Sequence, residues 1–216
     1  MSEHGIQIER EHRAGEVRRG RRLEYLTIGW NSLEGIAAIG AGLLAGSIAL
    51  VGFGFDSLIE VSSGAALLWR LHMDEPEKRE RAERIALRLV GISFLLLAGY
   101  IGFDAIKSLL KREPPEVSYL GITIAALSLV VMPLLARAKR KVATSIDSRA
   151  MHADSRQTDL CAYLSAILLG GLIVNAILGW WWADPVAALV MIPIIAKEGI
   201  EALRGEACRD DECWPN

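Results

Sequence analysis

The sequence lacks the features that mark most enzymes and secreted proteins. Its 216 residues include three cysteines, one inside an apolar run and two near the C-terminus, which is not the pattern of a disulfide framework. It contains no Gly-x-Ser-x-Gly, no His-Glu-x-x-His and no glycine-rich phosphate loop. The first 22 residues have no short apolar core of the kind that a cleavable signal peptide needs. We therefore expect a protein that is not an enzyme and whose N-terminus is not cleaved.

Charged residues are scarce over long stretches, and this distribution indicates the class of protein. Hydrophobic residues make up 52% of the chain, and they form runs of about 20 residues, enough for a helix to cross about 30 Å of hydrocarbon. No basic, aromatic-bearing domain for nucleic acid is present. A polar tail at 1–22 and a short tail at 206–216 flank a domain at 23–205. We predict an all-α membrane protein, a six-helix bundle with spans at 25–45, 47–69, 85–109, 118–136, 156–178 and 185–203.

The positions of Lys and Arg predict how the chain crosses the membrane. Basic residues cluster in the tail 1–22, in the loop before the third span and at 137–141, whereas the loops between them hold few. Because cytosolic loops carry the excess of basic residues, both termini are expected in the cytosol of a multi-pass protein of the plasma or inner membrane. Pro76 is expected in a charged loop, and Pro133 is expected to kink or end the fourth span.

The run at 47–69 carries two acids, Asp56 and Glu60, near its middle. A carboxylate at bilayer depth costs at least about 2.5 kcal/mol, so it is expected to face a bundle interior, a water-filled cavity or a cation. Residues four apart lie on one face of a helix, and two negative charges at that spacing repel each other. A metal ion between them is the simplest source of compensating positive charge.

A second pair with the same spacing, Gln157 and Cys161, lies in the fifth apolar run. Two helices that each present such a pair can build a four-coordinate metal site inside a bundle. A thiolate with carboxylates suits zinc better than magnesium or calcium, which prefer oxygen ligands only. The predicted ligands are Asp56, Glu60, Gln157 and Cys161, and we expect a transported divalent metal but no tightly bound cofactor.

Other polar residues leave two interpretations open. Glu34 is either a proton-carrying or accessory group or an acid near the headgroups that helps to close the cytosolic side. Asp154 and Asp159 either form a cytosolic mouth that attracts a cation or are charges at a helix start and interface. Cys208 and Cys213 are either metal ligands in the C-terminal tail or part of a solvated segment, because their spacing alone is a weak zinc signal.

Three stretches resemble the transmembrane domain of the cation diffusion facilitators, six-span exporters of divalent transition metals that exchange the metal for protons. GSIALVGFGFDSLIEVSSGAALL is similar to the family's second span, in which Asp56 and Glu60 stand at the metal-binding positions. ADSRQTDLC resembles the fifth-span motif Ala-Asp-x-x-His-x-x-x-Asp, with Gln157 in place of His and Cys161 in place of Asp. WWWADPVAALVMIPIIAKEGIEAL is similar to the sixth span and its preceding Asp-Pro.

The resemblance implies a transporter that exports zinc, or else manganese, cobalt or iron(II), by proton antiport. It also implies a homodimer, here held by membrane helices because only a short tail follows the sixth span. The alternative is a metal-binding membrane protein that does not transport, acting as a sensor, store or assembly partner, since both fifth-span ligand positions are changed. An intramembrane enzyme with Cys161 as nucleophile is less well supported, because no His lies within helical reach of it.

Overall fold

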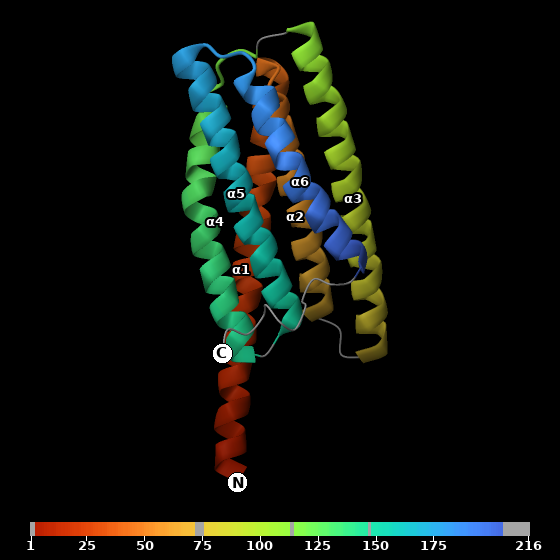
Figure 1. Ribbon diagram of the computed structural model, residues 1–216. Coiled ribbons are helices and arrows are strands. Elements are labelled where there is room, and N and C mark those ends of the chain that lie inside the picture. The colour runs from red at the N-terminus through yellow and green to blue at the C-terminus, as the bar shows by residue number, and fades with distance from the viewer. Residues whose placement is uncertain (1–2, 72–75, 113–114, 147, 205–216) are drawn as a thin grey trace, which may run out of the picture.

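Six α-helices make up the computed structural model, which describes residues 3–71, 76–112, 115–146 and 148–204. Figure 1 shows them as one elongated bundle in which successive helices run in opposite directions. Six alternating helices place the start of the first and the end of the last at the same end of the bundle. The helices are α1 (Glu3–Ala45), α2 (Ile48–Leu71), α3 (Pro76–Lys111), α4 (Tyr119–Ile146), α5 (Arg149–Leu178) and α6 (Ala183–Arg204).

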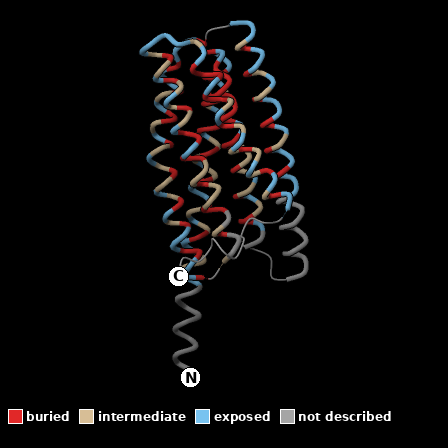
Figure 2. The backbone as a smooth tube through the Cα atoms, in the orientation of Figure 1, coloured by how far each residue is buried: buried red, intermediate tan, exposed pale blue. Residues whose placement is uncertain are grey.

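The surface of the bundle is apolar, which is the reverse of a soluble protein. Large hydrophobic side chains stay exposed along the outside, among them Leu44 at 87% and Leu110 at 80%, while Figure 2 shows the buried positions running along the inside of the bundle. Patches of this kind need a lipid environment, and a helix satisfies its own backbone hydrogen bonds there. Among the residues that the structure describes, five helices are long and apolar enough to cross a membrane, and α6 packs against α3, α5 and α2. The protein is therefore a multi-pass membrane protein, and the predicted all-α bundle is confirmed.

Helices α1 and α2 form a tight hairpin, joined by a short uncharged turn. Gly46 has a positive φ of 66° between the two helices, a conformation that glycine adopts without steric cost. Below the turn, a Cβ at Gly54 would lie 2.9 Å from the backbone nitrogen of Ile39 and 3.0 Å from the carbonyl oxygen of Gly35. These glycines therefore allow the two backbones to approach closely.

Several helices extend beyond the predicted spans. Helix α3 begins at Pro76, which was expected in a loop; proline is favoured in the first turn, where its missing N–H has no intrahelical role. Helix α4 continues through Pro133 as far as Ile146. Its buried stripe also continues past the basic segment, to Val142, Ala143 and Ile146, so tertiary packing outweighs the local effect of the proline.

Candidate functional site

Helix α2 places Asp56 and Glu60 in the interior of the bundle. Their exposed fractions are 5% and 2%. The start of this helix is held by Asp184 of α6, which is itself buried and accepts hydrogen bonds from the Ser47 hydroxyl and, at 2.9 Å, from the Ile48 N–H. A carboxylate at a helix N-terminus satisfies free N–H groups and favours the helix dipole. Asp184 therefore ties the start of α2 to the start of α6.

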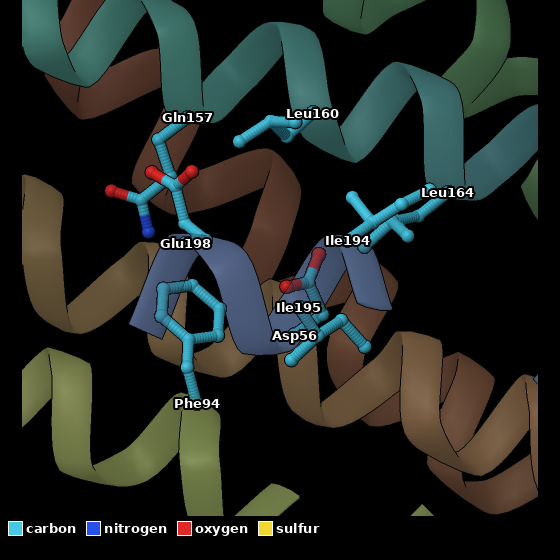
Figure 3. A pocket seen from close by; sticks show the side chains of 8 residues that line it. All are labelled: Asp56, Phe94, Gln157, Leu160, Leu164, Ile194, Ile195 and Glu198. Carbon is cyan, nitrogen blue, oxygen red and sulfur yellow. The ribbon is translucent and has the colours of Figure 1, made fainter. Parts of the chain in front are cut away.

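A small pocket lies between α2, α3, α5 and α6. Its polar lining is Asp56, Gln157 and Glu198, which Figure 3 shows entering from three different helices. Apolar side chains complete the lining: Phe94, Leu160, Leu164, Ile194 and Ile195. Few polar groups among apolar walls, with carboxylates from two helices and an amide from a third, suit a small cation.

The structure brings two of the four predicted ligands, Asp56 and Gln157, to this pocket, and the other two do not line it. Glu60 instead accepts a 2.7 Å hydrogen bond at Oε1 from the Thr158 hydroxyl of α5. Cys161 is 1% exposed and belongs to the apolar core. Across the described residues, no three His, Cys, Asp or Glu side chains are grouped closely enough to hold a metal ion. The four-ligand site thus remains a prediction, which this conformation does not assemble.

Next to Glu60 lies a buried charge network that crosses four helices. Lys139 of α4 is 0% exposed, and its Nζ lies 3.2 Å from Glu24 Oε2 of α1 and 2.5 Å from Asp154 Oδ2 of α5. The same Nζ donates to Thr158 Oγ1 at 3.3 Å. Since Thr158 also bonds Glu60 of α2, the network connects α1, α4 and α5 to the acid of the predicted site.

The accessory residues lie in three different environments. Asp154 is in the buried network, whereas Asp159 pairs with Arg140 in a partly exposed ion pair between α5 and α4. Glu34 is 2% exposed. Both of its carboxylate oxygens, and both amide atoms of Asn31, have no hydrogen-bond partner among the residues that the structure describes. The roles predicted for these acids stay predictions. Cys208 and Cys213 lie outside the described residues.

Sequence reasoning missed Glu198, Lys139 and Glu24. Glu198 lies inside the sixth apolar run, so the rule that singled out Asp56 applies equally to it. Lys139 was assigned to a basic loop, but Met132, Ala136, Lys139 and Ala143 share one helical face, a periodicity that reveals the buried position. Glu24 lies at the edge of a predicted span, and nothing in its local sequence distinguishes it from a surface acid.

Long helices that cross a membrane, with acids buried between them, are typical of a membrane transport domain. The cation efflux transmembrane domain matches this chain over residues 26–206. The chain therefore belongs to the cation efflux family, which confirms the resemblance seen in the second, fifth and sixth spans.

The individual relatives that match this chain have low sequence identity to it. The chain is 26% identical over 160 residues to an uncharacterized transporter, sll1263, of Synechocystis sp., covering 70% of this chain and 51% of that protein. It is 27% identical over 182 residues to transmembrane protein 163 of Xenopus laevis, covering 84% and 65%. It is 31% identical over 126 residues to a cadmium, cobalt and zinc/H(+)-K(+) antiporter of Bacillus velezensis, covering 56% and 38%. The chain thus spans only part of each relative.

Proposed function

We propose that the chain transports a divalent transition-metal cation out of the cytosol, with zinc as the cargo and protons as the exchanged ion. The observation that carries the proposal is the pocket of Asp56, Gln157 and Glu198, buried among apolar side chains between membrane helices. Buried acids at bilayer depth need a cation or protons to offset their charge. Membership of the cation efflux family supports a metal as that cation.

In this mechanism the cation binds from the cytosol at Asp56 and Gln157, while Glu60 and Cys161 complete the shell through side-chain movements that keep the Thr158–Glu60 hydrogen bond. Rocking of the bundle then exposes the cation to the other side, where protons displace it. Protons on the acids neutralise the empty site for the return step. Metal affinity rises with pH, because ligands must lose their protons to bind.

Equilibrium metal binding by the full chain in detergent tests the site. Zinc, manganese, cobalt and iron(II) are titrated against wild type, Asp56→Asn and the control Asp104→Asn, whose carboxylate pairs with Lys107 at 3.7 Å on a partly exposed face of α3. Outer-shell changes alone cost 10- to 100-fold in affinity, so loss of the Asp56 ligand should weaken binding at least about tenfold. The site is refuted if the two variants bind alike.

The second candidate is a metal-binding membrane protein without transport. It is favoured by the changed ligand positions in the fifth span. It is also favoured because Asp56 lines the pocket in this conformation while Glu60 binds Thr158 instead. Sealed vesicles separate the two functions: a transporter accumulates metal beyond the amount of protein present, whereas a binding protein takes up metal in a fixed ratio to itself.

The remaining assignments follow from the same proposal. We infer a transport role and no catalytic one, a homodimer, and a plasma- or inner-membrane location with both termini in the cytosol. The orientation is supported by the alternating helices, which place the start of α1 and the end of α6 at the same end of the bundle. It is also supported by the basic residues near that end.

A further inference from the structure

In the hydrogen bond between Lys139 and Thr158, the lysine can only be the donor. An ammonium group carries three donors and no acceptor. The 3.3 Å contact between Lys139 Nζ and Thr158 Oγ1 therefore uses the threonine oxygen as the acceptor. Lys139 itself is held by Glu24 at 3.2 Å and Asp154 at 2.5 Å with no exposure to solvent, so its position is determined by three helices.

The single hydrogen of the Thr158 hydroxyl then has two possible acceptors. One is Glu60 Oε1 at 2.7 Å, and the other is the backbone carbonyl of Asp154 at 3.1 Å. A hydrogen bond to a carboxylate is shorter and stronger than a neutral one, so the hydrogen goes to Glu60. Glu60 Oε1 is thus occupied, whereas Oε2 is buried and has no partner among the residues described.

We propose that Thr158, oriented by Lys139, is a positioning residue that holds Glu60 Oε1 so that only Oε2 is presented to the transported cation. This inference rests on the proposed function, because it needs Glu60 to bind the cargo. A carboxylate restricted to one oxygen suits a small tetrahedral cation such as zinc, whose bonds to oxygen are about 2.0 to 2.2 Å long. A larger cation gains from a carboxylate that can turn and bind through both oxygens. The Thr158 hydroxyl therefore favours zinc over the larger cadmium ion.

Competition of zinc and cadmium against a fluorescent chelator tests this in the full chain. Thr158→Val removes the hydroxyl at nearly the same volume, and Thr158→Ser retains it. The matched control is Thr27→Val, since Thr27 is also buried but its hydroxyl donates to the Leu23 carbonyl of its own helix at 2.9 Å. One lost hydrogen bond to a charged group predicts a shift of about tenfold in the zinc-to-cadmium affinity ratio, towards cadmium, for Thr158→Val. Thr158→Ser and Thr27→Val keep the wild-type ratio.

A second measurement reads the metal-bound carboxylate in the wild-type chain, and a variant serves only to assign the spectrum. Isotope-edited infrared spectra of ¹³C-labelled glutamate are recorded with and without zinc, and Glu60→Gln identifies the band. One-oxygen binding widens the separation of the two carboxylate stretching bands, and two-oxygen binding narrows it. A narrowed separation in wild type overturns the proposal.

The outcomes also separate this inference from the proposed function. If wild type binds neither metal, the proposed function fails. If wild type binds zinc and Thr158→Val keeps its zinc-to-cadmium ratio, only the positioning role fails. A Thr158→Ser variant that shifts as far as Thr158→Val overturns the role of the hydroxyl, and a Thr27→Val variant with the same shift makes the effect one of packing alone.

Discussion

Replacing Lys139 by Met should destabilise the protein strongly, although the residue belongs to a basic segment. The ammonium group is the only cation within hydrogen-bond distance of Glu24 Oε2 and Asp154 Oδ2 in the described network. Side-chain exposure is 0% for Lys139 and Glu24 and 4% for Asp154, so water cannot take the place of the ammonium group. Removing one partner of a buried pair costs about 3 to 5 kcal/mol, because the other charge is left uncompensated.

The structure also predicts a rescue. If Glu24→Gln and Asp154→Asn are combined with Lys139→Met, neither carboxylate that pairs with Lys139 remains charged, and the variant should recover part of the lost free energy of unfolding. This expectation follows because the uncompensated buried charges, which account for most of the cost, are removed. Unfolding by SDS in mixed micelles, followed by circular dichroism, measures both effects.

The matched control for Lys139→Met is Lys141→Met, which changes an exposed lysine two residues further along α4. Exposed substitutions usually change stability by no more than about 0.5 kcal/mol. The reasoning is refuted if the two lysine variants unfold at the same SDS fraction, or if the triple variant is less stable than Lys139→Met alone.

Two further predictions concern the packing that positions α2. Gly54→Ala should cost about 1 to 3 kcal/mol, because its Cβ meets the α1 backbone at 2.9 Å; Gly40→Ala, with open space around its Cβ, should be neutral or slightly stabilising, and equal unfolding of the two variants would contradict the close approach. Asp184→Asn should weaken the α2 N-terminus by about 1 to 2 kcal/mol through the lost charge. Hydrogen exchange at Ile48 measures this change, and unaltered protection would show that Asp184 does not cap the helix.

Much of the fold could be predicted from the sequence, because membrane helices are defined by local hydropathy. The six helices and the hairpin turn at Gly46 follow from runs of apolar residues and from a turn without charge. The helix limits could not be read in the same way. Helix α3 starts at Pro76 and α4 passes Pro133 because tertiary packing and first-turn geometry decide these points.

The candidate site was less accessible to sequence reasoning. The spacing of Asp56 and Glu60 predicts a shared helix face, and both are buried. The spacing does not determine the rotation of α2 relative to α5 and α6. That rotation places Asp56 in the pocket beside Glu198, whereas it places Glu60 within hydrogen-bond distance of Thr158. That rotation depends on contacts between distant segments, such as Asp184 with the start of α2.

Transport through the pocket of Asp56 can be measured as zinc flux into sealed proteoliposomes. The vesicles hold an internal zinc dye and an imposed pH gradient, and contain wild type, Asp56→Asn or Asp104→Asn. We expect saturable zinc accumulation that depends on the gradient in wild type and Asp104→Asn and is lost in Asp56→Asn. Accumulation by Asp56→Asn at the wild-type rate would contradict this expectation, and so would stoichiometric binding without accumulation in wild type.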